Sequence, residues 1–250
     1  MSRFPSLFVS HGSPTLALER GGAADFLRGY GERLGRPEAI LVVSAHWETA
    51  APAVGTSPAP GTIHDFRGFP EALHRIRYPA PGAPDMAAEA ARRVEAATGR
   101  PVRLDPERGL DHGAWVPLSL MYPQADVPVL QLSLPSHAGP ALQERVGQVL
   151  ASLREQDVLL IGSGSITHNL GELDWRAGPE VIEPWAGEFR DWMVGKLQAD
   201  DRLALLDYRR QAPHARRNHP SEEHLLPLYF ALGAGGAFQL EHSGFTYGAL

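Results

Sequence analysis

The chain has 250 residues, of which 43% are hydrophobic and 21% are charged, and it contains eleven histidines and no cysteine. The formal net charge of −6 and the scattered arginines give no basic surface of the kind that binds nucleic acid or anionic lipid. The longest apolar runs, 39–43 and 158–161, are far too short to cross a bilayer, so we expect a soluble cytoplasmic protein without a membrane partner.

Short apolar runs bounded by Gly, Pro, Ser or His are typical of buried strands. We expect strands at 7–10, 39–44, 101–104, 127–132, 158–162 and 237–242. Between them, apolar residues recur at spacings of three and four, which predicts helices. The expected helices are 23–34, 85–97, 140–155, 183–199 and 221–232.

The repeated strand–helix–strand order predicts an α/β fold, with a mainly parallel central sheet between helices in a three-layer α/β/α arrangement. A chain of this length forms a core without being divided, so we expect residues 1–250 to be a single catalytic domain. The segments 47–83 and 105–115 fit neither pattern, and loops of such length are usually functional.

Three histidines follow expected strands: His11 follows the first, His46 the second, and His168 lies six residues after the fifth. Ligands of open α/β sheets bind outside the carboxyl ends of the strands. Neutral imidazole is the commonest metal ligand, and the absence of cysteine excludes thiolate ligands. A single histidine after a strand is more often a hydrogen-bonded structural residue, but the three together predict a metal centre.

His224 is the fourth candidate ligand. Pro220 fits the first position of a helix and Glu222 and Glu223 suit its positive end, so we expect His224 within or just after the first turn. The helix field there disfavours protonation and leaves the imidazole able to bind a metal. His219, which precedes the proline, is expected to cap the helix.

Two further motifs lie in the long loops. His112 follows Asp111 and is flanked by glycines, and the sequence alone does not separate an acid/base role from a turn cap. His64 and Asp65 combine with nearby aromatic residues either to line a substrate pocket or to pin the loop to the core. Gly162 to Ile166 does not match a nucleophile elbow, and no phosphate-binding glycine motif is present.

Six motifs, in order along nearly the whole chain, resemble the DODA-type class III extradiol ring-cleavage dioxygenases, which are related to the catalytic subunit of protocatechuate 4,5-dioxygenase. They are His11-Gly12-Ser13-Pro14, Ser44-Ala45-His46-Trp47, His64-Asp65-Phe66 with Gly68-Phe69-Pro70, Asp111-His112-Gly113-Ala114-Trp115, His168-Asn169-Leu170 and Glu223-His224-Leu225-Leu226-Pro227-Leu228.

The resemblance implies a three-layer α/β fold and a mononuclear non-haem Fe(II) centre. It implies His11, His46 and His224 as principal ligands and His168 as a further ligand or a close neighbour of the ligands. His112 would be the catalytic acid/base. The wider superfamily has a carboxylate where this chain has His224, and an all-histidine site is similar to catalytic zinc sites, so Zn(II) stays open beside Fe(II).

The reaction implied is extradiol cleavage of a DOPA-like catechol by dioxygen, which gives a muconic semialdehyde. In that case His64 and Asp65 would contact the aromatic diol, and aromatic neighbours would stack on its ring; these are Trp47, Phe66, Phe69 and Trp115. The alternative is a zinc-dependent hydrolase on the same scaffold, and a third possibility is a ligand-binding protein without turnover. The sequence indicates no oligomeric state.

Overall fold

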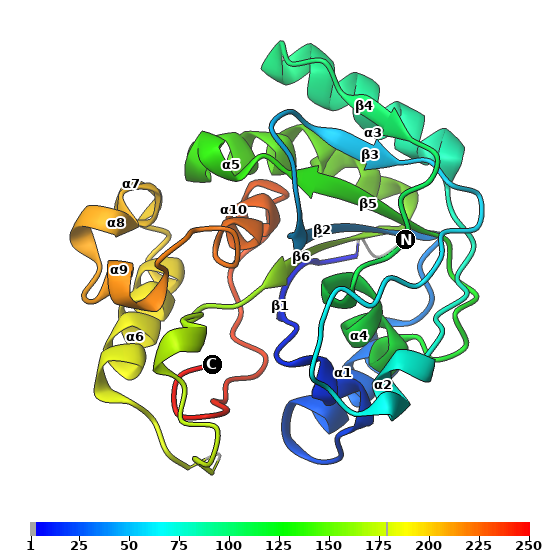
Figure 1. Ribbon diagram of the computed structural model, residues 1–250. Helices are drawn as coiled ribbons and strands as arrows, with labels where there is room; N and C mark the ends of the chain where they lie inside the picture. The colour runs from blue at the N-terminus through cyan, green and yellow to red at the C-terminus, as the bar shows by residue number, and fades with distance from the viewer. Residues whose placement is uncertain (1–3, 179) are drawn as a thin grey trace.

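The computed structural model describes residues 4–178 and 180–250, which form an α/β structure around one six-stranded sheet (Figure 1). The strands are β1 (Ser6–Ser10), β2 (Ala39–Glu48), β3 (Ala53–Gly55), β4 (Arg103–Asp105), β5 (Val129–Leu134) and β6 (Val158–Gly164), and their order across the sheet is β1-β6-β2-β5-β3-β4.

The four strands β1, β6, β2 and β5 are parallel to one another. β3 pairs antiparallel with β5 and parallel with β4, so this edge of the sheet runs in the opposite direction. The prediction of a mainly parallel sheet is therefore confirmed. The carboxyl ends of β1, β6 and β2 lie side by side, which brings segments that are distant in the sequence to one edge.

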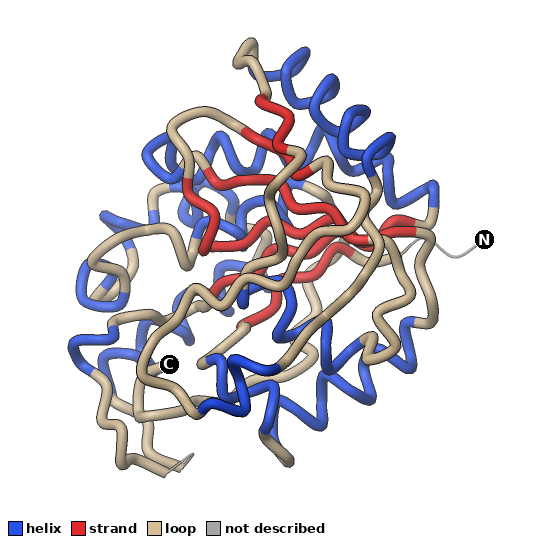
Figure 2. Tube along the Cα trace, turned by 45° about the vertical axis from the view of Figure 1, so that its right-hand side comes forward, coloured by secondary structure: helices blue, strands red, loops and turns tan. Residues whose placement is uncertain are grey.

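Alternate residues of the central strands face two different helical layers, which Figure 2 shows on both sides of the sheet. Leu41 and Val43 pack with the helices α3 (Pro84–Thr98), α5 (Gly139–Leu150) and α10 (Leu226–Gly233). Ile40 and Val42 pack on the opposite face with α1 (Gly22–Leu34) and α4 (His112–Met121). The three-layer α/β/α prediction is confirmed.

The remaining helices surround this core. A cluster beside the α10 layer contains α6 (Pro184–Gln198), α7 (Arg202–Leu206), α8 (Tyr208–Gln211) and α9 (Ala215–Asn218), and α2 (Glu71–Arg75) lies near α1 and α4 on the other side (Figure 1). Short 3-10 helices occur at Pro14–Leu18, Ser136–Ala138, Ala151–Gln156 and Leu170–Glu172.

Three local predictions were wrong. The segment 237–242 forms no strand among the described residues: it follows Gly235 and Gly236, both with positive φ, and is largely exposed. The helix expected from 221 begins only at Leu226, because Pro227 rather than Pro220 lies in its first turn. Within the loops 47–83 and 105–115, β3 and α2 form, and α4 begins at His112.

No helix in the described ranges 4–178 and 180–250 is both long enough and apolar enough to cross a membrane.

Candidate metal centre

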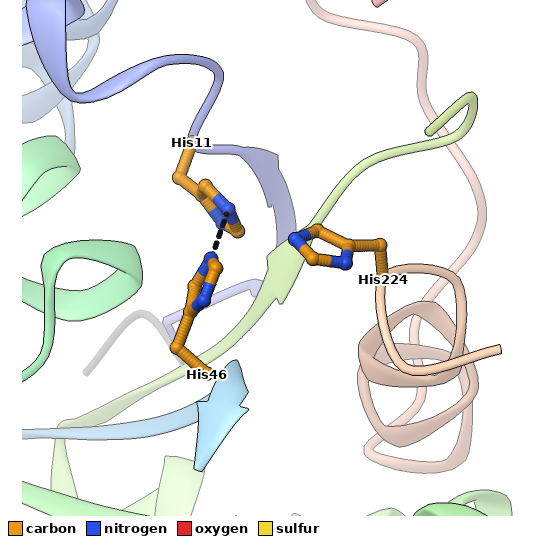
Figure 3. Close-up of side chains that lie close together, drawn as sticks. All are labelled: His11, His46 and His224. Atoms are coloured by element: carbon orange, nitrogen blue, oxygen red, sulfur yellow. Dashed lines mark hydrogen bonds between the residues drawn. The ribbon is translucent and has the colours of Figure 1, made fainter. Parts of the chain in front are cut away.

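Three imidazoles meet at the carboxyl edge of the parallel strands: His11 directly follows β1, His46 lies in the last part of β2, and His224 precedes α10 (Figure 3). Their rings point toward one another, and one nitrogen of each lies within 4.8 Å of the others. The Nε2 atoms of His11 and His46 are 3.0 Å apart. The predicted convergence of His11, His46 and His224 is therefore present.

The strand β6 between β1 and β2 lets the third histidine approach. Gly164 has no side chain, and a Cβ atom there would lie 2.0 Å from the carbonyl oxygen of His224. The same carbonyl accepts a hydrogen bond from the backbone N–H of Ser165 at 2.8 Å. The end of β6 thus holds the His224 backbone beside the strand ends that carry His11 and His46.

The hydrogen bonds of His11 fix its tautomer. The Ser163 hydroxyl donates to the carbonyl oxygen of Gly113, so its oxygen is free to accept a hydrogen bond from Nδ1–H of His11 at 3.0 Å. The proton of a neutral His11 is then on Nδ1, and the lone pair of Nε2 faces His46. In the metal-free protein His46 donates its Nε2–H to that lone pair, and a metal ion would replace this proton.

His224 has the same arrangement with a different partner. Its Nδ1–H donates to Oε1 of Glu223 at 2.9 Å, which leaves the lone pair on Nε2. Nε2 is buried and has no hydrogen-bond partner among the residues that the structure describes. A buried nitrogen without a partner costs free energy, and coordination to a metal ion would satisfy it.

Burial keeps these rings neutral. Loss of solvation lowers the pKa of His11 and of His224 well below the usual value, and the neighbouring histidines lower it further. Burial and then the charge of His112 lower the pKa of His46 to about 4. Burial is the largest cause of the lowered pKa of His224, whose ring lies two residues before the helix rather than within its first turn.

These features fit a divalent metal ion. Three neutral imidazoles place nitrogen atoms next to one another: Nε2 of His11 and of His224 carry lone pairs, and Nε2 of His46 would offer one after its proton is replaced. In His11 and His224 the second nitrogen is held by a hydrogen bond, as is usual for metal-binding histidines.

His168 lies beside His224 rather than opposite it. The two rings are parallel within 7°, and their centroids are 3.4 Å apart. His168, Glu223 and His224 also bring one potential ligand atom each within 4.8 Å of one another.

His112 lies on the other side of the cluster, at the first position of α4. Its ring centroid is 3.8 Å from that of His46 and 5.5 Å from that of His11. Asp65 Oδ1 accepts hydrogen bonds from both Nδ1–H and the backbone N–H of His112, at 2.9 Å and 3.0 Å. Partial burial raises the pKa of Asp65, but the bonds from His112 outweigh it and lower the pKa to about 2.

The other predicted substrate residues have structural partners. Nε2 of His64 lies 3.0 Å from the carbonyl oxygen of Ile76 within the same long loop. The ring of Trp47 faces the Arg108 guanidinium, 4.7 Å from the ring centroid. Trp115 has no exposed surface, and its indole N–H donates to the carbonyl oxygen of Ile63. Substrate contact by His64, Asp65, Trp47 or Trp115 stays a prediction, which for Trp115 has no support from the geometry.

Residues that orient the histidines were missed in the sequence. Ser163 lies on the strand next to β1, and only the pairing of β1 with β6 brings it to His11. Glu223 is adjacent to His224 and was interpreted only as a residue of a helix start. His219 was expected to cap a helix, but it is fully buried, and its Nε2 lies 2.7 Å from the carbonyl oxygen of Ile166.

Residues 5–249 match the model of a protein family described as the catalytic LigB subunit of aromatic ring-opening dioxygenase. The chain belongs to this family.

Curated relatives within it are named 4,5-DOPA dioxygenase extradiol. The protein from Beta vulgaris is 42% identical, with 92% of this chain and 87% of the relative covered, and that from Escherichia coli K12 is 41% identical, with 93% and 86% covered. A solved structure of an uncharacterized Escherichia coli K12 protein superposes with a TM-score of 0.82 at 34% identity, covering 99% of this chain and 97% of the other.

This LigB-family chain is an extradiol aromatic ring-opening dioxygenase, which makes it an oxidoreductase. Dioxygenases of the LigB family depend on a metal, and the cluster of His11, His46 and His224 is a possible site for it. The comparisons give no support to the zinc-dependent hydrolase considered as an alternative.

The depressed pKa values of the site predict how the metal-free dioxygenase responds to acid. Between about pH 6.5 and pH 4 the unfolded chain binds protons at histidines that stay neutral when folded, so stability falls as the pH falls. The loss is about 1.4 kcal/mol per pH unit for each such proton. Urea unfolding of chelator-treated protein at a series of pH values measures this loss. In His46→Gln the free energy of unfolding should depend less steeply on pH. If the free energy of unfolding stays constant or rises as the pH is lowered, the site histidines are not held neutral in the folded protein.

Proposed function

We propose that His11, His46 and His224 bind a single Fe(II) ion and that the dioxygenase uses it to cleave a DOPA-like catechol next to its diol, giving a muconic semialdehyde. The buried Nε2 of His224, which has no partner among the described residues and faces the His11–His46 pair, carries the proposal. Zn(II) is a second ion that the same three imidazoles can hold.

A bound Fe(II) ion would supply Lewis acidity toward the catechol hydroxyls and a one-electron path that overcomes the spin barrier to reaction with dioxygen. The protein supplies a rigid set of donors on one side of the site. His11 and His46 come from strand ends, and His224 is held to β6 through its own carbonyl group. This one-sided placement would leave room for the diol and dioxygen.

His112 would move the proton of the second catechol hydroxyl. Asp65 accepts its Nδ1–H, so the lone pair of a neutral His112 is on Nε2, and the ring lies directly beside His46. A base with one nitrogen fixed by a carboxylate accepts a proton on the other nitrogen and can return it later in the reaction. Asp65 then acts by fixing the tautomer and orientation of His112.

We assign His168 as a neighbour of the metal ligands, not as a ligand. The His168 ring stacks on one face of the His224 ring and holds it in place. Burial lowers the pKa of His168 and keeps this ring neutral. On the opposite side of the site, Phe66 approaches the His112 ring edge-on at 5.7 Å and provides an apolar surface for an aromatic substrate. The curated relatives' names support a DOPA-like substrate.

Metal content separates the three proposed ligands from His168. His46→Ala removes a donor and should weaken metal binding by more than about 100-fold, since the loss of an outer partner alone costs 10- to 100-fold. His168→Ala should retain one metal ion per chain. Inductively coupled plasma mass spectrometry after dialysis measures both, with the unsubstituted protein as control. Unchanged metal in His46→Ala, or its loss in His168→Ala, would contradict the ligand set.

Oxygen consumption tests the reaction. After anaerobic loading with Fe(II), the protein should consume dioxygen with a catechol such as DOPA and form a yellow ring-opened product. His112→Phe should keep its metal but lose about 100-fold or more in rate, as expected when a general acid/base is removed. An oxygen electrode with parallel absorbance measurement follows both.

The outcomes are distinct. Absence of oxygen uptake across a panel of catechols by metal-loaded protein would refute the proposed activity. Full activity of metal-loaded His112→Phe would remove His112 from the mechanism and leave the activity in place.

A further inference from the structure

A fully buried carboxylate lies beneath the histidine cluster, between β2, β5 and α4. Asp111 has no exposed surface, and its two oxygens accept hydrogen bonds from four groups. They are Ser44 Oγ at 2.7 Å, Ala114 N at 3.2 Å, Arg108 Nη2 at 2.7 Å and Gln131 Nε2 at 2.8 Å.

One oxygen of this carboxylate connects the end of β2, which carries His46, to the start of α4, which carries His112, through hydrogen bonds. Asp111 Oδ1 caps α4 through Ala114 N–H and accepts the Ser44 hydroxyl hydrogen bond. Ser44 Oγ in turn accepts the backbone N–H of His46 at 3.2 Å. Two hydrogen bonds in sequence, through Ser44, therefore link Asp111 to the backbone of His46.

The surroundings leave this connection little freedom. A Cβ atom on Gly113 would lie 2.3 Å from Ser44 Oγ and 3.1 Å from Cδ2 of His46, so the first turn of α4 is pressed against β2. Arg108, the cation paired with Asp111, lies over the Trp47 ring, and its Nη2 is 3.5 Å from the carbonyl oxygen of His46.

We propose that Asp111 is a positioning residue for the metal centre. Held by Arg108 and Gln131, it fixes the backbone of His46 through Ser44 and places that ligand at a set distance from His112. The inference rests on the metal site proposed above, since it concerns how one of its ligands is held.

A role in stability alone does not account for this arrangement. A buried ion pair is often no more stabilising than apolar residues of the same size, because the charges lose their hydration. The bonds of Asp111 instead join Ala114, in the first turn of the helix that begins at His112, to Ser44, two residues before His46. Such outer partners of metal-binding histidines typically contribute 10- to 100-fold to metal affinity.

Two substitutions break the connection at different points. Asp111→Asn replaces one acceptor oxygen by an N–H₂ group that faces hydrogen-bond donors, and Ser44→Ala removes the hydroxyl beside His46. Each should weaken Zn(II) binding by about 10- to 100-fold. The dissociation constant is measured by competition with a chromophoric chelator on metal-stripped protein, together with the thermal unfolding midpoint.

A double variant tests rescue. Adding Gln131→Glu to Asp111→Asn returns a carboxylate beside Arg108 and gives the new amide an acceptor, so metal affinity should return to within a few-fold of the original. Tyr78→Phe is the matched control: it removes a buried hydrogen bond to the Tyr122 carbonyl in the same core layer, and this bond is not part of the Asp111 network. It should lower the unfolding midpoint and leave metal affinity unchanged.

Weakened affinity in Asp111→Asn and Ser44→Ala, with rescue by the double variant, supports the proposal. Unchanged affinity in Ser44→Ala, or a double variant that recovers the unfolding midpoint without the affinity, overturns it. If Asp111→Asn does not fold, Ser44→Ala decides alone. Failure of the unsubstituted protein to bind Zn(II) would instead refute the metal site itself.

Discussion

The site depends on keeping three imidazoles neutral, two of them buried and one half-buried, at the carboxyl edge of the parallel strands. The strand order β1-β6-β2 brings His11 and His46 together, and the glycine at the end of β6 allows the His224 backbone to join them. Burial and mutual repulsion make protonation of any of these rings unfavourable. Sheet topology therefore brings the three rings together, and desolvation keeps them unprotonated, as binding of a metal ion requires.

An all-histidine site leaves the charge of a divalent ion uncompensated by its own ligands. At the proposed site, carboxylates that contact the histidine rings would compensate this charge. Glu223 binds Nδ1 of His224, and Asp65 binds Nδ1 of His112 while its second oxygen lies 3.7 Å from Nδ1 of His46. Each carboxylate also fixes a ring orientation, so charge compensation and positioning are provided by the same contacts.

The sequence was most informative where apolar runs precede a histidine. Buried runs end next to His11 and His46, so their place at the sheet edge could be predicted. The position of His224 could not, because Pro220 and Pro227 both suit a helix start and only packing selects Pro227. The stacking of His168 on His224 and the bond from His11 to Ser163 depend on contacts between distant segments, which no local pattern encodes.

The central claim is that three imidazoles, and not four, bind the metal ion. X-ray absorption of the Zn(II)-loaded protein tests it most directly. We expect the outer-ring scattering of three imidazoles whose nitrogens lie at about 2.0–2.1 Å from the metal, with the remaining positions taken by oxygen ligands that have no such ring. A shell of four imidazoles would place His168 on the metal, and a shell with fewer than three would show that His11, His46 and His224 do not act together.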